Sequence, residues 1–308
     1  MNELRHNSMG ITGVDRARRF RVETAFRHLQ TEHFPKGELW LGTDILKKAG
    51  FEDNLEGRLR LVKRLKHRMI CLSTARDAYL DRALGYRYFP VSAIQEVLDT
   101  TDLFVMAVID GPFQRLVGKK GLMKVLTGWV SEKETVLKAY ENERMDVENL
   151  LDCCLERAVH GVVIADDLAG DQGTFFHPLD IKGFSSPFYD RAVSEIHGAH
   201  AVALFHSCGN ISKIIPQLLS NGFDGLAAVQ DRTNDLVSLK ARYGSQLVLM
   251  AGIEGEILNK EELSPSDLES LKGRLHSLAQ GGGFILSSSC GLYSGGFLER
   301  IEAIYRLA

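Results

Sequence analysis

Short apolar runs alternate with longer amphipathic segments along this chain. The runs are five to eight residues long and end in glycine or in polar residues. Continuous apolar runs of this length are typical of strands that are buried on both faces. They predict eight strands, at residues 38–42, 69–73, 103–110, 161–166, 201–206, 225–230, 247–252 and 283–287.

The segments between these runs carry helical periodicity. Apolar side chains recur on one face of residues 15–30, 210–221 and 234–243. A further helix is expected after Ser264, because Ser264 is a favourable N-cap and Asp267 stands at the position of an acidic capping partner. Strands that alternate with helices predict a parallel sheet.

Eight such units in 308 residues predict an α/β protein with a TIM (β/α)8 barrel. A doubly wound open sheet is the alternative, but no Gly-x-Gly-x-x-Gly turn follows the first strand. The connection at 111–157 is too long for a plain crossover and contains two helical patterns, so we expect an extended insertion after the third strand that caps the barrel mouth. Residues 1–308 are predicted to form one domain, with 1–13 as a mobile lead-in.

The composition is that of an ordinary globular protein. The chain is 44% hydrophobic and 25% charged, with a formal net charge of −3. This balance gives no drive toward nucleic acid or an anionic membrane, and no apolar run approaches the roughly 20 residues that span a bilayer. The first residues lack the apolar core of a signal peptide, so we expect a cytoplasmic protein whose five cysteines stay reduced.

Polar residues that carry chemistry stand where the predicted strands end. In a TIM barrel the carboxyl ends of the strands form the active face. Asp110 ends the third strand, Asp166 and Asp167 end the fourth, His206 ends the fifth with Cys208 just beyond it, Gln230 ends the sixth, and Cys290 follows the eighth. Asp166 and Asp167 are the candidate catalytic residues. We expect them to point to opposite faces because they are adjacent, so that one faces the pocket as a substrate ligand or acid–base group. The alternative is that they only cap a loop.

His206, Cys208 and Cys290 are the candidate metal ligands. Imidazole and thiolate suit Zn²⁺, and three protein ligands with one open position are the pattern of a catalytic zinc site. Zinc would hold a substrate thiol as thiolate at neutral pH. The alternative is that these side chains are packed or hydrogen-bonded without a metal. Asp110 and Gln230 are the candidate cofactor-binding residues at neighbouring strand ends.

Residues from about 160 to 305 resemble the uroporphyrinogen decarboxylase superfamily, and within it the cobalamin-dependent methyltransferase branch. The resemblance rests on the stretches at 166–170, 186–189, 206–210, 222–225, 229–230 and 282–286. It implies a TIM barrel that binds zinc through His206, Cys208 and Cys290. It further implies that the zinc binds a thiol such as coenzyme M, which accepts a methyl group from a methyl-corrinoid (a cobalamin) held by a separate protein.

Two departures bear on the activity that we expect. The chain has no Asp-x-His-x-x-Gly corrinoid motif, so a partner corrinoid protein would supply the cofactor. It also lacks the arginine-rich N-terminal segment with which true uroporphyrinogen decarboxylases bind propionates. The alternatives are a decarboxylase-like lyase acting on a tetrapyrrole or aromatic carboxylate, with Asp110 or Asp166 as polar anchor, and a non-catalytic corrinoid- or tetrapyrrole-binding accessory protein. The sequence leaves the methyl acceptor and the oligomeric state open.

Overall fold

The structure is a computed structural model that describes residues 22–260, 262–289, 291–293 and 298–307. Its first half contains α2 (Thr43–Lys48), α3 (Leu55–Arg64), β1 (Met69–Ala75), β2 (Tyr79–Asp81), β3 (Tyr86–Pro90), α4 (Ser92–Thr100), β4 (Phe104–Asp110), α5 (Pro112–Lys120), α6 (Leu122–Ser131) and α7 (Lys133–Leu155). Its second half contains β5 (Gly161–Ala165), β6 (Ala169–Gly170), β7 (Gly173–Thr174), α8 (Pro178–Gly198), β8 (Val202–His206), α9 (Ile215–Ser220), β9 (Gly225–Val229), α10 (Asp231–Asn234), α11 (Leu236–Tyr243), β10 (Val248–Ile253), α12 (Gly255–Asn259), α13 (Pro265–Ala279), β11 (Phe284–Ser288) and α14 (Leu298–Tyr305).

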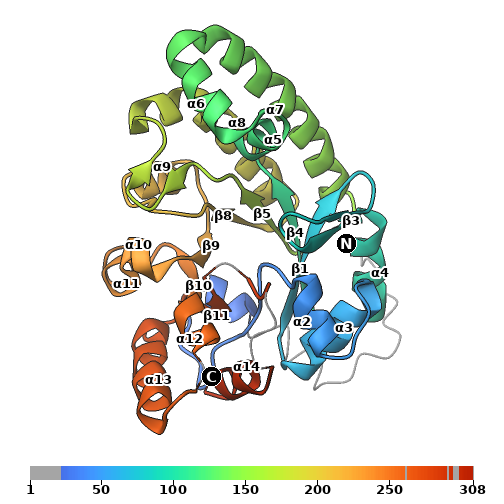
Figure 1. The fold of residues 1–308 in the computed structure, drawn as a ribbon, viewed down its shortest axis with the longest axis vertical. Coiled ribbons are helices and arrows are strands. Elements are labelled where there is room, and N and C mark those ends of the chain that lie inside the picture. Colours follow the sequence, from blue (N-terminus) through green and yellow to red (C-terminus); the bar gives the residue numbers. More distant parts are fainter. Residues whose placement is uncertain (1–21, 261, 290, 294–297, 308) are drawn as a thin grey trace, which may run out of the picture.

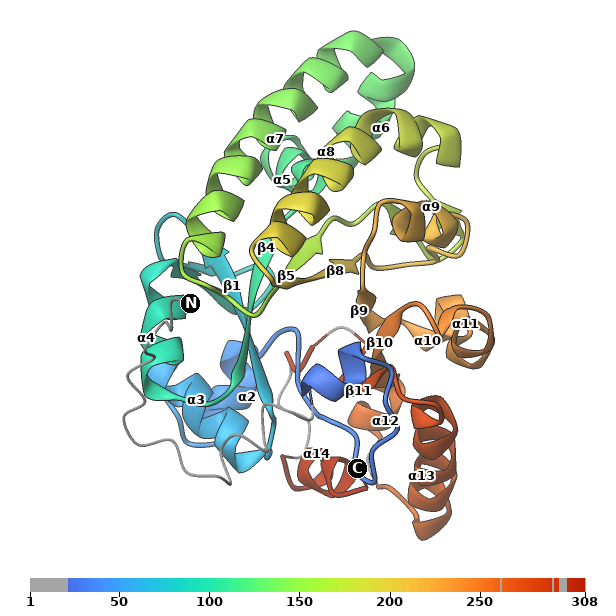
Figure 2. The same ribbon diagram turned by 180° about the vertical axis from the view of Figure 1, so that it is seen from behind.

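A curled sheet organises the molecule (Figures 1 and 2). Its strand order is β11-β10-β9-β8-β5-β4-β1-β3-β2, and every neighbouring pair is parallel except β2 with β3. Seven of these strands coincide with predicted ones, and helices follow most of them on the outer side. The expected TIM-barrel architecture is confirmed.

Each central strand is buried on both faces, as its continuous apolar run predicts. In β4, Val105, Ala107 and Ile109 belong to the core between sheet and helices. Phe104, Met106 and Val108 belong to a second core inside the curled sheet. Because alternate side chains of a strand point to opposite faces of the sheet, one run of apolar residues contributes to both cores.

The strand predicted at 38–42 does not form a continuous ladder. This segment lies between β11 and β1, where Lys36 bridges Leu286 and the carbonyl of Lys36 accepts a hydrogen bond from Arg68 N (3.0 Å). The ladder stops because the buried carboxylate of Glu38 accepts the backbone N–H of Ser288 (2.9 Å). A side chain thus uses the donor of β11 that a paired strand would need.

A hairpin that the sequence reasoning missed extends the sheet beyond β1. Strands β2 and β3 pair antiparallel, with Tyr79 opposite Tyr88 and Asp81 opposite Tyr86. The alternation of aromatic and polar residues at 86–88 was the available signal, since Tyr and Phe favour strands. The hairpin matters because it carries Tyr86 and Tyr88 to the active face.

The long connection after β4 contains three helices, α5, α6 and α7, rather than the two expected. Gly121, at φ +84°, separates α5 from α6 in a conformation that favours glycine. Together with α8 these helices stand above the sheet at the upper end of Figures 1 and 2. Of the insertion, only Gln114 in α5 contacts the cleft described below, within the part of the chain that the structure describes. That it caps the barrel mouth stays a prediction.

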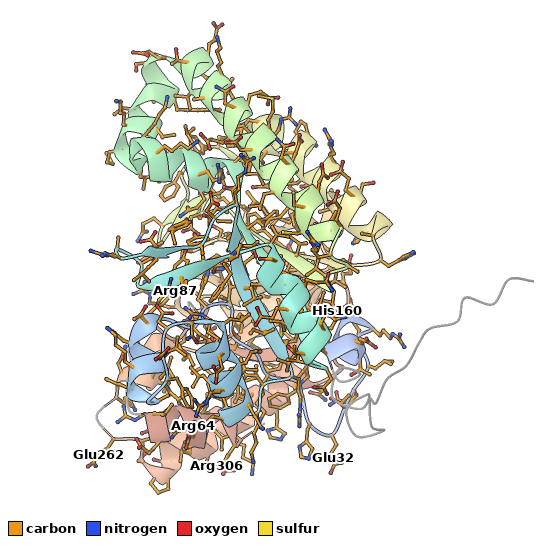
Figure 3. All side chains as sticks on the ribbon, turned by 90° about the vertical axis from the view of Figure 1, so that its right-hand side faces the viewer. Glu32, Arg64, Arg87, His160, Glu262 and Arg306 are labelled. Atoms are coloured by element: carbon orange, nitrogen blue, oxygen red, sulfur yellow. The ribbon has the colours of Figure 1, made fainter. Side chains whose placement is uncertain are left out.

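An ion pair joins α3, near the start of the described chain, to α14, near its end. Arg64 of α3 forms an ion pair with Glu302 of α14 (2.6 Å), and Arg64 and Arg306 lie at the lower end of the molecule in Figure 3. The predicted N-terminal helix is observed over residues 22–26, and its first part, like the lead-in at 1–13, falls outside the described residues. Among the helices that the structure describes, none is both long enough and apolar enough to cross a membrane.

The capping box predicted at Ser264 is confirmed. Ser264 Oγ accepts the backbone N–H of Asp267 (3.1 Å), and Asp267 Oδ2 accepts the backbone N–H of Ser264 (3.0 Å). We expect Ser264→Ala to lower the free energy of unfolding by about 1 kcal/mol, because one helix donor loses its partner. Urea denaturation measures this change. Ser277→Ala, at an exposed position of the same helix, should stay within about 0.5 kcal/mol of the parent.

Candidate metal centre and substrate cleft

His206 is the last residue of β8, and its imidazole is buried. Nδ1 lies 2.8 Å from the carbonyl oxygen of Ala227 in β9. A carbonyl can only accept a hydrogen bond, so Nδ1 carries the proton and the lone pair of the neutral ring is on Nε2. Burial lowers the pKa of His206 and keeps the ring neutral. The fold therefore presets the tautomer that a metal ligand requires.

Cys208 and Asp167 converge on that lone pair. Cys208 Sγ lies 3.8 Å from His206 Nε2, and Asp167 Oδ1 lies 3.7 Å from the same nitrogen. The ligand atoms of the three residues all lie within 4.8 Å of one another. The parallel pairing of β5 with β8 sets Ala165 opposite His206, so the residues after each strand meet at one edge of the sheet.

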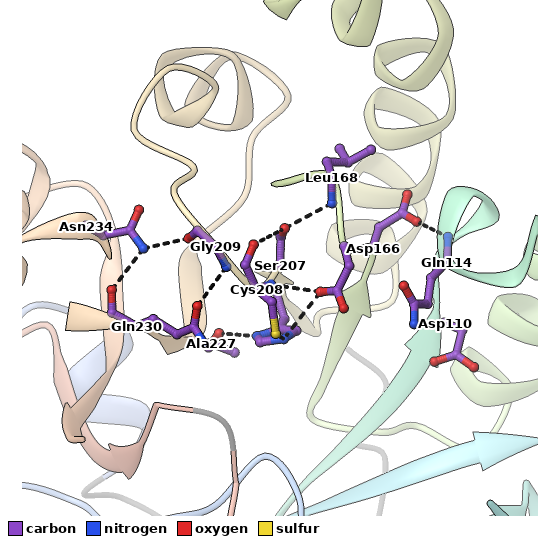
Figure 4. A network of polar contacts seen from close by, with 12 residues as sticks. Asp110, Gln114, Asp166, Leu168, Ser207, Cys208, Gly209, Ala227, Gln230 and Asn234 are labelled. Carbon is purple, nitrogen blue, oxygen red and sulfur yellow. Dashed lines mark hydrogen bonds and ion pairs between the residues drawn. The ribbon is translucent and has the colours of Figure 1, made fainter. Parts of the chain in front are cut away.

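The loop that carries Cys208 is fixed on both sides (Figure 4). Ser207 Oγ accepts the backbone N–H of Leu168 (3.0 Å), and Gln230 Oε1 accepts the backbone N–H of Gly209 (2.8 Å). Asn234 Nδ2 donates to the carbonyl of Gly209 (2.8 Å). Gln230, which we expected to bind a cofactor, is thus placed to hold the loop, and it does not line the cleft.

Asp166 and Asp167 point in different directions, as adjacent residues at a strand end should. Asp166 is fully buried, and its carboxylate accepts the backbone N–H of Gln114 in the first turn of α5 (2.7 Å) and the hydroxyl of Tyr189 (2.8 Å). Burial raises the pKa of Asp166 to about 7, although both hydrogen bonds act in the opposite direction. Asp166 therefore anchors the insertion, and Asp167 faces the metal-ligand cluster.

A cleft of about 300 Å³ opens beside the three clustered side chains. Its lining residues come from six separate parts of the chain: Trp40, Ala83, Leu84, Tyr86, Asp110, Gln114, Ala165, Asp167, His206, Cys208 and Tyr293. The half-buried Asp110 stands at the end of β4, and Tyr88 donates its hydroxyl to both carboxylate oxygens (2.7 and 3.0 Å). Burial raises the pKa of Asp110 to about 6, so its carboxylate is mostly ionised at neutral pH.

An aromatic wall adjoins Asp110 in the cleft, because the hydroxyl of Tyr86 lies 2.9 Å from that of Tyr88, which donates to Asp110. The ring of Trp40 stacks near those of Tyr86 (5.9 Å between centroids) and Tyr293 (6.2 Å). It also meets the imidazole of His206 edge-on at 4.7 Å. The wall limits access of water to the ligand nitrogen and makes this part of the cleft aromatic.

The structure brings together only part of the predicted site. His206, Cys208 and Asp167 cluster, Asp110 lines the same cleft, and Asp166 and Gln230 support it from outside. Cys290, the predicted third zinc ligand, falls outside the described residues. Sequence reasoning missed the aromatic wall and Gln114. Only the strand-like pattern around Tyr86 gave a signal for any of them.

The site can now be compared with known proteins. A family model described as uroporphyrinogen decarboxylase (URO-D) matches residues 76–308. Two curated relatives from Methanosarcina barkeri strains are both described as methylcobamide:CoM methyltransferase MtaA. One is 27% identical over 105 residues, which cover 34% of this chain and 30% of the relative. The other is 25% identical over 150 residues, which cover 49% of this chain and 41% of the relative. The matches thus span less than half the length of these relatives.

Solved structures agree on the fold. A methyltransferase from Methanosarcina mazei superposes with a TM-score of 0.72 at 15% identity, covering 94% of this chain and 97% of its own. A protein described as a vitamin-B12-independent methionine synthase, from Listeria monocytogenes, gives 0.54 at 12% identity and covers 90% of this chain and 96% of its own. At these identities the likeness establishes the fold alone. Because the family model matches well over half of the residues, this chain belongs to the uroporphyrinogen decarboxylase family, and its resemblance to the methyltransferase branch of that family is confirmed.

Proposed function

We propose that this protein is a zinc-dependent methyltransferase. It would move a methyl group from a methyl-corrinoid, carried by a separate protein, to a thiol bound in the cleft. The observation that carries the proposal is the convergence of Cys208 and Asp167 on the Nε2 lone pair of His206. The methyltransferase relatives support the reaction class.

The donor atoms fit zinc in type and in spacing. Zn–N and Zn–S bonds of about 2.0 and 2.3 Å at a tetrahedral angle separate nitrogen and sulfur by about 3.5 Å. The observed separation of His206 Nε2 and Cys208 Sγ, 3.8 Å, is close to that value. Nitrogen, sulfur and carboxylate donors are the set that zinc accepts, whereas magnesium and calcium prefer oxygen alone.

We propose His206, Cys208 and Cys290 as the protein ligands. Asp167 either acts as a further metal ligand or orients the thiol next to the metal. Its Oδ1 accepts a hydrogen bond from the backbone N–H of Cys208 (2.7 Å). Zinc, when bound, would supply the positive charge that keeps the acceptor thiol deprotonated at neutral pH. In the reaction the thiolate sulfur forms the new bond to the methyl carbon, and the electron pair of the cobalt–carbon bond stays with the corrinoid.

The residues of the chain itself orient the reactants and exclude water. The hydrogen bond from His206 Nδ1 to Ala227 fixes the imidazole plane. The edge-on ring of Trp40 covers that imidazole on one side. Asp110, held by Tyr88, is the polar anchor across the cleft. Holding the reactants in a fixed orientation before they react lowers the entropic part of the activation barrier for methyl transfer.

Metal content tests this proposal directly. Protein purified without chelators should contain about one zinc per chain by elemental analysis. The zinc-loaded protein should transfer methyl groups from free methylcobalamin to small thiols, and apoprotein prepared with a chelator should not. Lack of bound metal, together with lack of transfer after zinc is added back, would contradict the proposal.

Gly209 gives a test that leaves every ligand in place. Its φ is +79°, and an added Cβ would lie 2.5 Å from the carbonyl oxygen of Gly170. Gly209→Ala must therefore displace the loop that carries Cys208, and we expect zinc affinity to fall about tenfold or more, as when outer-sphere partners of a ligand are lost. Competition with a chelating dye measures the affinity. In the control, Gly118→Ala, the added Cβ meets nothing within 4 Å. Unchanged affinity in the Gly209 variant would contradict the expected role of the loop.

No observation favours the decarboxylase alternative. Tetrapyrrole substrates carry several carboxylates, and the charged residues that line the cleft, within the described chain, are Asp110 and Asp167. A volume of about 300 Å³ also lies at the lower end for a ligand site. Both features suit a small acceptor better than a polyanionic macrocycle.

A further inference from the structure

The charge of the cleft is one-sided. Its lining residues include two carboxylates, Asp110 and Asp167, and no lysine or arginine among those that the structure describes.

Two basic side chains near the cleft, Arg115 and Arg87, are committed to other partners, and the exposed Arg82 does not line the cleft although the adjacent Ala83 and Leu84 do. Arg115 lies close enough to Asp110 to stabilise its ionised form, but the guanidinium of Arg115 binds Glu143 and Asp146, each at 3.2 Å. Arg87, on the hairpin next to Tyr88, is paired with Asp53 at 3.6 Å. Neither is therefore available to neutralise an anion in the cleft.

Asp110 forms no ion pair within 4.0 Å among the described residues, although Arg115 acts on it from farther away. Its hydrogen bonds come from the neutral hydroxyl of Tyr88, which itself lies 2.9 Å from the hydroxyl of Tyr86. A carboxylate held by neutral donors keeps its full negative charge. A ligand that brings a positive charge to this position would gain a charge-assisted hydrogen bond.

The aromatic wall also favours a cation. The rings of Trp40, Tyr86 and Tyr293 line the cleft with Asp110, and the negative face of an aromatic ring attracts an ammonium group within about 6 Å. A sulfonate or a carboxylate gains no such attraction from a ring face. The carboxylate and the aromatic rings thus favour the same sign of charge on a ligand.

We propose that the methyl acceptor is a thiol with a positively charged ammonium tail, which Asp110 and the aromatic wall bind while the sulfur lies at the His206–Cys208 cluster. The inference rests on the proposed function and goes beyond it by naming the substrate class. It also separates this chain from the relatives named for CoM, because coenzyme M (2-mercaptoethanesulfonate) is an anionic thiol.

Three thiols of the same chain length test the proposal. Cysteamine carries an ammonium tail, 2-mercaptoethanol a neutral one, and 2-mercaptoethanesulfonate a negative one. With zinc-loaded protein and methylcobalamin as donor, kcat/KM for cysteamine should exceed that for 2-mercaptoethanol by about tenfold or more, the scale of a hydrogen bond to a charged group. The sulfonate should be the poorest acceptor.

Binding of the methylated products gives a readout that needs no turnover. Isothermal titration should show 2-(methylthio)ethylamine binding more tightly than 2-(methylthio)ethanesulfonate by about the same factor. Asp110→Asn should bring both the binding ratio and the rate ratio of amine to alcohol down toward one. Asp152→Asn, at an exposed position of α7, is the matched control and should keep both ratios.

The outcomes separate this inference from the proposed function. Methyl transfer that favours the sulfonate, or that ignores tail charge, would overturn the inference and leave the methyltransferase intact. A preference of the protein for the cationic thioether without any methyl transfer would support the cationic site and count against the proposed reaction. An Asp110→Asn variant with an unchanged preference would also overturn the inference.

Discussion

Replacing Cys208 with alanine is expected to release zinc and to lower methyl transfer by more than about a hundredfold. Even outer-sphere partners of a zinc ligand are worth about 10- to 100-fold in affinity or activity, so loss of a ligand should cost more. Cys208 supplies the only sulfur near His206 Nε2 within the described residues. Without it, two of the three proposed protein ligands, His206 and Cys290, would remain beside Asp167, and a site that has lost one of three ligands holds zinc weakly.

Zinc content and methyl transfer from methylcobalamin should be measured on the same preparations. Cys153→Ala is the matched control, because Cys153 is an exposed free cysteine on α7. That variant should keep both zinc and activity. Should Cys208→Ala retain one equivalent of zinc and the parental rate, the cluster would not be the metal centre. His206→Ala should reproduce the loss independently.

The second large effect concerns stability rather than chemistry. Asp166→Ala is expected to lower the free energy of unfolding by about 3 kcal/mol, because two buried donors lose their acceptor and a cavity remains. The donors are the backbone N–H of Gln114 and the hydroxyl of Tyr189. Since α5 begins at this point, its first turn and the cleft wall at Gln114 should loosen as well.

Urea denaturation in the presence of a chelator isolates this effect from metal binding. Asp166→Asn should cost less than alanine, because the amide oxygen still accepts one of the two hydrogen bonds. Asp167→Asn should stay within about 1 kcal/mol of the parent, since that side chain is 35% exposed and accepts one backbone N–H. Equal losses at Asp166 and Asp167 would contradict the division of roles between them.

Much of the fold follows from local pattern. The strand positions follow from apolar runs, because a strand buried on both faces must be apolar throughout, as Val105 to Ile109 illustrate. The start of α13 follows from Ser264 and Asp267, whose side chains bond only to the adjacent turn. The pairing of His206 with Cys208 follows from their spacing at one strand end. Each of these features depends on residues close together in the chain.

Other features depend on residues that are distant in sequence. The strand predicted at 38–42 is interrupted because Glu38 binds Ser288, about 250 positions away. Gln114 and Tyr189 donate hydrogen bonds to the carboxylate of Asp166, and these bonds leave Asp167 to face the metal centre. The pattern of residues along the sequence does not show which distant hydrogen-bond donors and acceptors will pair.

The sequence by itself determined the barrel, the edge of the sheet that carries the chemistry, and the residue types that make a zinc site plausible there. Tertiary structure alone decided that Asp167 joins His206 and Cys208, and that Trp40, Tyr86 and Tyr293 line one cleft with Asp110. The physical reason is that strand order and curvature bring these segments together. The sign of charge in the cleft, and with it the acceptor that we propose, is a property of that assembly.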